Sequence, residues 1–188
     1  HLGIKPTHRS TLAYANEHRT HELFKKVFFR MLSKCQEIAP KHKFAFKNPL
    51  FSIDATVIPL CLSLYNWAKF RAKKGAVKLH MKLNHSGYLP TFMVMTPGKV
   101  HETKISPSIP LDEGDVAIFD KGYTDFAWYK SLDDKGVIFV TRIKRNAQYD
   151  VIERKDVSRY KYIYSDQTLK LKGFYSSQKY PDRLRRIR

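Results

Sequence analysis

The sequence predicts an α/β fold built on a mixed sheet, and three observations support this prediction. Residues 51–58, 77–84 and 89–96 are rich in apolar and β-branched side chains, and only the turn sequence HSGY separates the last two. An apolar run, a helical pattern and a second apolar run then follow one another over residues 115–143. An amphipathic pattern over residues 20–38 predicts a helix before the first strand.

The N-terminal region is predicted to be helical. Residues 20–38 place their apolar side chains on one face at helical spacing, with Thr20 as a candidate N-cap. The preceding segment 9–19 predicts a shorter helix, capped by Ser10 or Thr11. A linker follows before the first strand, so we expect this region to be separate from the sheet.

Residues 115–143 predict a parallel pair of strands. A buried strand over 115–119 is followed by a helical pattern over 124–135 with Thr124 as its cap, and by a further buried strand over 137–143. A strand, a helix and a strand in this order imply a parallel crossover. The sequence thus predicts three antiparallel strands, followed by this strand–helix–strand unit, with helices flanking the sheet. Ribonuclease-H-like domains have the same order of elements.

The character of the sequence changes from residue 146 onward. The segments SRYKYIYSD and QTLKLKGFYS alternate between apolar and polar residues, and KGF and YPD read as turns between them. The sequence therefore predicts strands of a separate, β-rich piece.

The charge predicts a polyanionic partner. The 188 residues contain 35 Lys and Arg against 17 Asp and Glu, a net charge of +18. No acid occurs from Ala55 to His101, although a folded surface usually mixes both signs. We expect this stretch to contact phosphate, with nucleic acid as the commonest polyanion. Its cations are Lys69, Arg71, Lys73, Lys74, Lys78, Lys82 and Lys99.

The cellular compartment of the protein is predicted from features that the sequence lacks. There is no apolar run of membrane-spanning length, and the first ten residues, HLGIKPTHRS, contain no apolar leader. Cys35 and Cys61 form no zinc or redox spacing, so we interpret both as reduced packing residues. We expect a cytoplasmic, nucleoid-associated protein.

Two carboxylates are the candidate catalytic residues. Asp54 lies in the middle of the first predicted strand, and Asp120 directly follows the fourth. An acid in mid-strand is costly unless it is paired or binds metal, whereas Asp120 alone could equally cap a turn before Gly122. If the two strands are neighbours, both acids meet at one site. Two hard oxygen ligands suit Mg²⁺ or Mn²⁺, and metal binding is the interpretation that we favour.

The histidines carry less information. His18 with His21, and His80 with His85, have no acid or cysteine partner at zinc spacing, so we interpret them as surface or core residues. Glu102, in the sequence KVHE, could approach the metal site or lie in a plain loop. These alternatives stay open at the level of sequence.

The chain resembles, in order and over nearly its whole length, the bacterial insertion-sequence-four family of DDE transposases. The segments that carry the resemblance are RSTLAYANEHRTHELF, FSIDATVI, LCLSLYNWAKFRAKKGAVKLHMKLNHSGYLPTF, KVHE, DKGY, FVTRIKRN, DQTLKLKGFYSS and YPDRLRRIR. This resemblance implies an enzyme that cuts DNA at transposon ends and joins the 3′-hydroxyls to target DNA, using two divalent ions. Asp54 matches the first catalytic acid of the family and Asp120 the second.

The resemblance also implies an incomplete site. The third acid of the family is a glutamate in a Tyr-Arg-Glu-Lys-type motif on a helix beyond the β-rich insertion. Glu153 lacks that motif, so we do not assign it this role. We therefore expect a truncated chain that is inactive alone and has part of its core exposed. The implied domains are an N-terminal helical region (1–48), an incomplete ribonuclease-H-like core (49–145) and part of the insertion (146–188).

The expected partner is double-stranded DNA, bound by a homodimer on paired ends without membrane contact. Backbone contacts are expected from Lys69, Arg71, Lys73 and Lys74, and from Arg142, Lys144 and Arg145 after the last strand. Two alternatives remain at this stage: a non-catalytic DNA-binding module, and a ribonuclease-H-like nuclease that only hydrolyses.

Overall fold

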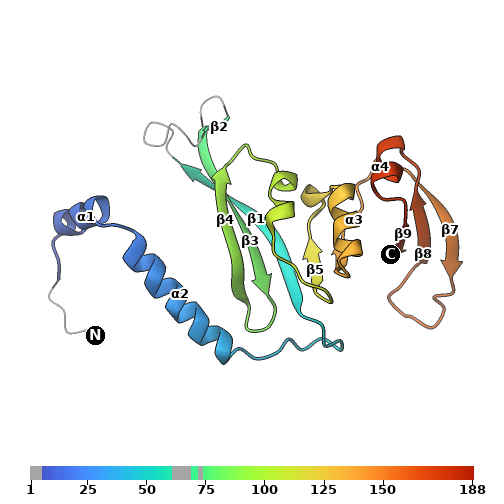
Figure 1. Ribbon diagram of the computed structural model, residues 1–188, viewed down its shortest axis with the longest axis horizontal. Coiled ribbons are helices and arrows are strands. Elements are labelled where there is room, and N and C mark those ends of the chain that lie inside the picture. Colours follow the sequence, from blue (N-terminus) through green and yellow to red (C-terminus); the bar gives the residue numbers. More distant parts are fainter. Residues whose placement is uncertain (1–5, 61–68, 72–73) are drawn as a thin grey trace. The chain divides into compact units, whose positions relative to one another are not determined.

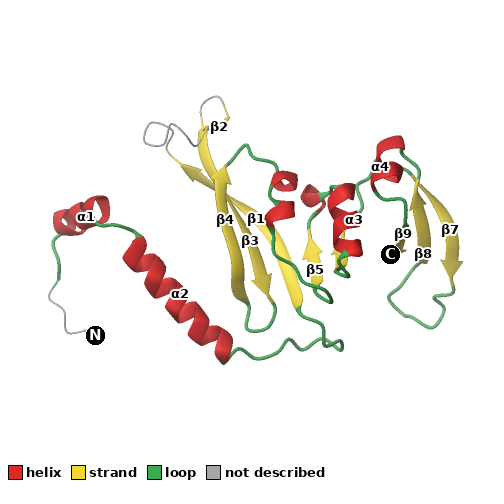
Figure 2. Cartoon of the chain, viewed as in Figure 1, coloured by secondary structure: helices red, strands yellow, loops and turns green. Residues whose placement is uncertain are grey.

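The computed structural model describes residues 6–60, 69–71 and 74–188 (Figure 1). The chain divides into two compact units, residues 1–40 and residues 41–188. The first unit is helical and the second carries the strands (Figure 2).

The first helix of the N-terminal unit, α1 (Arg9–His18), was predicted, but its cap was not. The Nδ1 atom of the His8 ring accepts the N–H of Ser10 at 3.4 Å. The predicted caps Ser10 and Thr11 are wrong, because an imidazole nitrogen can accept this hydrogen bond as a hydroxyl oxygen does.

The second helix, α2 (Glu22–Glu37), confirms the amphipathic pattern. The predicted N-cap Thr20 is wrong, because His21 occupies that position, although Thr20 Oγ1 accepts the N–H of Glu22 at 3.3 Å. The interpretation of Cys35 as a packing residue is wrong, since its thiol is exposed, and Cys61 lies outside the described residues. Within the described part of the chain, neither α2 nor another helix has the length and apolarity needed to cross a membrane.

The second unit is built on a mixed sheet. Its strands are β1 (Leu50–Leu60), β2 (Lys69–Arg71), β3 (Lys74–Asn84), β4 (Leu89–Pro97), β5 (Val116–Phe119) and β6 (Ile138–Thr141). They follow the order β2-β3-β1-β5-β6, and β4 also pairs with β3. β3 is antiparallel to both β1 and β4, while β5 is parallel to both β1 and β6. This confirms the predicted strands, except that residues 69–71 form β2 within the predicted loop.

Helix α3 (Phe126–Asp134) connects β5 to β6. Its N-cap is Asp125, whose Oδ1 accepts the N–H of Ala127 at 2.9 Å. The predicted cap Thr124 is wrong, because its hydroxyl is used in a hydrogen bond to the carbonyl of Lys121 at 2.6 Å.

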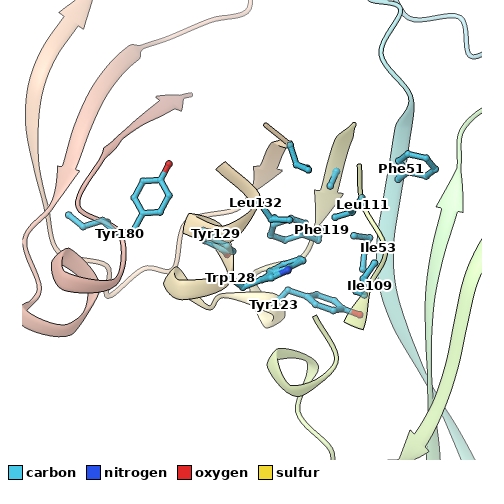
Figure 3. Packing of buried hydrophobic residues seen from close by; sticks show 13 residues of the cluster. Phe51, Ile53, Ile109, Leu111, Phe119, Tyr123, Trp128, Tyr129, Leu132 and Tyr180 are labelled. Atoms are coloured by element: carbon cyan, nitrogen blue, oxygen red, sulfur yellow. The ribbon is translucent and has the colours of Figure 1, made fainter. Parts of the chain in front are cut away.

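Aromatic side chains of α3 and β5 form the centre of the core (Figure 3). The Phe119 ring lies 4.8 Å from that of Trp128 and 5.6 Å from that of Tyr129. Ile53 of β1 and Tyr123 belong to the same cluster and are almost fully buried. α3 thus covers one face of the sheet at β5 and β6.

The opposite face of β5 and β6 is open. Ile118 pairs with Val140 across the two strands, and both side chains are exposed, together with that of Ile138. The prediction of a strand buried on both faces over 137–143 is therefore wrong. Its apolar composition reflects an apolar face that no described residue covers.

A second sheet lies in the C-terminal part of the unit. Its antiparallel strands are β7 (Tyr149–Lys155), β8 (Asp166–Leu171) and β9 (Arg183–Ile187), with helix α4 (Phe174–Lys179) between the last two. The predicted strand in SRYKYIYSD is wrong, because residues 157–165 form turns. The predicted strand end in KGFYS is also wrong, since α4 begins there.

Gly136 is a position where the fold requires glycine. It follows α3 with a φ of +76°, and its N–H donates to the carbonyl of Asp133 while Val137 donates to that of Leu132. This is a Schellman ending, which needs a left-handed residue.

We expect Gly136→Ala to destabilise the chain by about 1–2 kcal/mol, because a side chain is strained at positive φ. Gly122→Ala is the matched control. Gly122 is not among the positive-φ residues, and an added Cβ would lie 3.5 Å from Asp120 Oδ1, an ordinary contact. Its free energy of unfolding should change by less than about 0.5 kcal/mol in urea titrations. Equal losses for both variants would contradict this account of Gly136.

Candidate catalytic site at the ends of β1 and β5

The two candidate acids occupy adjacent positions across the sheet. β1 and β5 are parallel, and their last paired residues are Ile53 and Phe119. The next residue of each chain is an aspartate, Asp54 on β1 and Asp120 after β5. Neighbouring strands lie about 4.8 Å apart, so this register brings the two carboxylates to one edge of the parallel pair.

Asp54 is held at this position by its buried neighbour. Ile53 is 2% exposed and faces the core, and successive strand residues face opposite sides of a sheet. The Asp54 side chain is accordingly exposed, although β1 continues to Leu60. The predicted cost of an acid in mid-strand is avoided because Asp54 lies on a solvated face.

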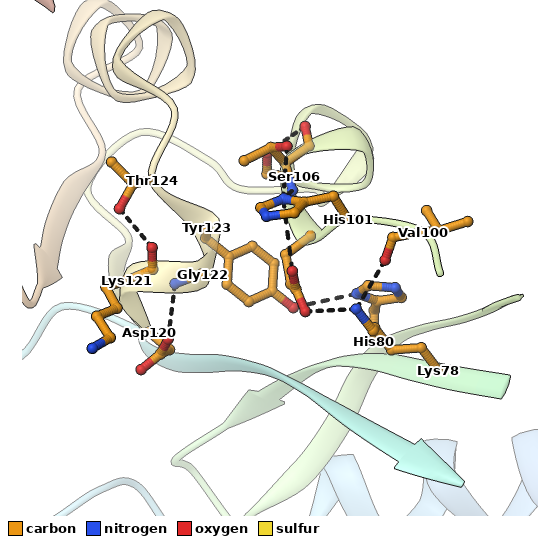
Figure 4. Close-up of polar contacts among 12 residues, drawn as sticks. Lys78, His80, Val100, His101, Ser106, Asp120, Lys121, Gly122, Tyr123 and Thr124 are labelled. Atoms are coloured by element: carbon orange, nitrogen blue, oxygen red, sulfur yellow. Dashed lines mark hydrogen bonds and ion pairs between the residues drawn. The ribbon is translucent and has the colours of Figure 1, made fainter. Parts of the chain in front are cut away.

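Asp120 is both a turn cap and a candidate ligand. Its Oδ1 accepts the N–H of Gly122 at 2.8 Å, at the start of the 3-10 turn η4 (Lys121–Tyr123) (Figure 4). The turn is anchored by Tyr123, which is 1% exposed. The other carboxylate oxygen, Oδ2, is not used by the cap. The two interpretations of Asp120 are therefore compatible.

Arg142, directly after β6, contacts Oδ2 of Asp120, the carboxylate oxygen that does not cap the turn. Its guanidinium donates a hydrogen bond to Asp120 Oδ2, and both side chains are at least 40% exposed. The hydrogen bond from the Gly122 N–H, followed by that from Arg142, holds the pKa of the Asp120 carboxyl below its usual value. Arg142 was predicted to contact DNA, and here it is the counter-ion of a candidate metal ligand.

A second ion pair lies behind the turn. Lys78 Nζ donates to Glu102 Oε1 at 2.8 Å and to the Val100 carbonyl at 2.9 Å, and the lysine side chain is 11% exposed (Figure 4). Burial alone would raise the pKa of Glu102, but the hydrogen bond from Lys78 holds it below its usual value. Glu102 begins a 3-10 turn, and its Cδ would lie 3.7 Å from a Cβ added to Gly122, so it lies close to the turn that follows Asp120.

Two lysines of the acid-free stretch are not available to phosphate. Lys78 is committed to Glu102, and Lys82 donates to the Pro110 carbonyl at 2.6 Å while its Nζ lies 4.1 Å from the centre of the Phe51 ring. The expectation that both contact phosphate is wrong. The strand alternation of residues 77–84 could not have identified them, because it predicts that the apolar residues face the core, whereas the structure buries Lys78, His80 and Lys82.

Tyr123 and His80 are further residues that sequence reasoning missed. The ring of His80, which is fully buried, lies with Nδ1 3.4 Å from the Tyr123 hydroxyl and Nε2 3.1 Å from Thr96 Oγ1. Burial, and then the charges of Asp54, Glu102 and Asp120, raise the pKa of Tyr123. Burial lowers the pKa of His80, with a smaller contribution from Lys78.

The donors present fit a divalent ion of the Mg²⁺ type in part. Asp54 and Asp120 offer carboxylate oxygens, the ligands that Mg²⁺ and Mn²⁺ take together with water and phosphate. Among the described residues, no group of three or more His, Cys, Asp or Glu side chains could hold a metal ion. Glu153 lies on β7 of the second sheet, where its carboxylate accepts from Thr168 Oγ1. The described residues thus offer two candidate ligands, Asp54 and Asp120.

The structure describes the other residues that were predicted to contact DNA to different extents. Lys144 and Arg145 are exposed in the segment after β6. The backbone of Lys69 and Arg71 belongs to β2, and Lys74 begins β3. The remaining predicted contact, Lys73, lies outside the described residues.

Comparison with known proteins shows the family of this chain. Residues 45–186 match the protein family described as "Transposase DDE domain". A protein described as "Putative transposase y4zB", from Sinorhizobium fredii (strain NBRC 101917 / NGR234), is 28% identical over 146 residues. That alignment covers 78% of this chain and 40% of the relative, so the chain spans less than half of the relative's length.

The contact between Arg142 and Asp120 makes a prediction for pH titration. We expect Arg142→Gln to raise the pKa of Asp120 towards its ordinary value, because the guanidinium stabilises the charged carboxylate. The stabilisation due to the low pKa is present above the unfolded-state pKa of Asp120 and is lost as pH falls, so the variant should lose less stability on acidification. Carboxyl NMR titration measures the shift. Lys144→Gln removes the same charge away from this contact, and an equal effect of both variants would contradict the pairing.

Proposed function

This chain belongs to the Transposase DDE domain family, and from that premise we propose that its protein cuts DNA at the ends of a mobile element and joins the 3′-hydroxyls to target DNA. We assign it to the insertion-sequence-four group and its sheet to the ribonuclease-H-like fold. The single observation that carries the proposal is the register of β1 and β5, which makes Asp54 and Asp120 neighbours.

Asp54 and Asp120 are the residues that would hold Mg²⁺ or Mn²⁺. Two such ions, when bound, supply activation of the attacking oxygen and stabilisation of the leaving oxygen in an in-line displacement. The task of the protein is to hold the carboxylates side by side and to orient the phosphodiester between them. Arg142 would release Asp120 Oδ2 when the site is loaded, and could then turn to a DNA phosphate.

The third acid of the proposed site would come from a part of the protein outside these 188 residues. The longer relative has room for such a segment, and the described residues provide only two ligands. The apolar face of Ile118, Ile138 and Val140 adjoins the acids and is open to receive it. We accordingly propose that this chain alone is inactive.

Basic residues around the acids would hold the DNA backbone. Lys144 and Arg145 follow β6 directly after Arg142, on the strand next to the one that leads to Asp120. Further contacts to the DNA backbone would come from Lys69, Arg71, Lys73 and Lys74. We further propose a homodimer on paired ends, acting in the cytoplasm at the nucleoid.

A non-catalytic DNA-binding module is the second candidate function. The net charge of +18 favours DNA binding by itself, and the described residues lack a complete metal site. Such a module would bind DNA in a salt-sensitive manner without any dependence on divalent metal. A ribonuclease-H-like nuclease would depend on metal but would not join strands.

In a protein that extends this chain with the proposed third acid, we expect Mg²⁺-dependent nicking and joining of DNA that carries the element ends. Asp54→Ala and Asp120→Ala should each lower the rate at least about a hundredfold, because a bound ion contributes several kcal/mol to the transition state. The rate is measured with labelled DNA.

Asp112→Ala is the matched control, because this side chain is 92% exposed and its recorded ion pair is with Lys135, outside the proposed site. Nicking that survives both catalytic substitutions would contradict the assignment. Nicking without joining would identify a nuclease, and salt-sensitive binding without either reaction would identify a binding module.

A further inference from the structure

The ion pair of Lys78 and Glu102 joins three segments beneath the candidate site. Lys78 lies in β3, Glu102 begins the 3-10 turn η2 (Glu102–Lys104), and η2 lies against the turn η4. Both charged side chains are mostly buried, at 11% and 21% exposure. A buried ion pair contributes little net stability compared with apolar residues of similar volume. Its presence here therefore needs a reason other than stability.

Glu102 supports the turn that begins at Asp120. A Cβ added to Gly122 would lie 3.7 Å from Glu102 Cδ and 3.5 Å from Asp120 Oδ1, so the glycine lies between the two acids. The N–H of Gly122 in turn donates to Asp120 Oδ1 at 2.8 Å. The Glu102 side chain and Asp120 Oδ1 thus both lie near the α-carbon of Gly122, and η2 lies against η4.

Tyr123 extends the same arrangement on the covered face of the sheet. Its ring lies between the segment of Asp120 and that of His80 (Figure 4), and its hydroxyl lies 3.4 Å from His80 Nδ1. His80 and Lys78 are alternate residues of β3 and face the same side. One face of β3 thus holds the turn at two points, through Glu102 and through Tyr123.

We infer that Lys78 and Glu102 are positioning residues that fix the Asp120 carboxylate beside Asp54 through the turn at Gly122. Neither residue touches the metal or the DNA in this arrangement: the Glu102 carboxylate is occupied by the Lys78 ammonium, and Asp54 and Asp120 remain the ligands. This inference rests on the proposed function for its catalytic meaning, but the geometry of the turn can be tested without metal.

The test uses the double variant Lys78→Met/Glu102→Leu in the full chain. It removes both charges together, so no buried charge is left without a partner and the fold should persist. Hydrogen exchange of the backbone amides of Gly122, Tyr123 and Thr124 reports the turn directly, since the N–H of each donates a hydrogen bond within it. We expect their protection to fall on the order of tenfold, with the amides of α3 and β8 unchanged.

The second readout is Mn²⁺ affinity, measured by titration calorimetry. Residues that orient a metal ligand typically change affinity by about 10–100-fold, and we expect a loss in this range. Arg185→Met/Asp166→Leu is the matched control, because it removes the two-fold hydrogen-bonded pair of the second sheet, where the Arg185 Nη2 to Asp166 Oδ2 distance is 2.6 Å. It should affect neither readout at the turn.

The outcomes separate this inference from the proposed function. Unchanged exchange of the turn amides in the double variant would overturn the inference. So would unchanged Mn²⁺ affinity in a chain whose binding is lost in Asp120→Asn. If the chain binds Mn²⁺ and Asp120→Asn leaves that affinity unaltered, the proposed metal site fails, whereas a loosened turn would still support the positioning of Asp120 by this pair.

Discussion

The parallel pairing of β1 with β5 is the constraint on which the rest of the structure depends. Four backbone pairs, ending at Ile53 and Phe119, set the register of the two strands. Both of these residues are buried in the core, so a slip by one residue would turn apolar side chains towards solvent. The same burial that fixes the register also fixes Asp54 and Asp120 as the next residues, because each directly follows a core residue. The packing of Ile53 and Phe119 on one face of the sheet thereby determines that Asp54 and Asp120 follow them at the ends of the paired segments.

The arrangement of the cations around Asp54 and Asp120 cannot be read from the composition alone. Although the chain has a net charge of +18, two lysines of β3 point inward and interact with Glu102 and with the Pro110 carbonyl. Arg142 meets Asp120 on the outer side. Lys78 and Arg142 therefore pair with carboxylates, whereas Lys144 and Arg145 are exposed. Proximity in sequence to the acids does not by itself make a lysine a phosphate contact.

Most of the sheet could be predicted from the sequence, since strands such as β1 and β4 carry strong local patterns. That Asp54 and Asp120 lie near each other could be predicted from the order of elements and from family resemblance.

The features that could not be predicted depend on contacts between residues that are far apart in the chain. The tyrosines of residues 157–165 alternate like a strand, but among the described strands none pairs with Tyr160 or Tyr162, and only the end of the segment, at Tyr164 and Ser165, is hydrogen-bonded to Arg188. The place of Glu102 depends on its contact with Lys78, which lies 24 residues away in the chain. Local patterns contain no information on such contacts.

The most direct test of the central claim is to find where a divalent ion binds. Mn²⁺ broadens the NMR signals of nearby nuclei, so a titration of the ¹⁵N-labelled chain maps its position. The account predicts that the amides of residues 53–55 and 119–122 broaden at the lowest Mn²⁺ concentrations, and that this is lost in Asp54→Asn/Asp120→Asn. Broadening that begins elsewhere, such as at the exposed acids Asp112 and Glu113, or that persists in the double variant, would contradict it.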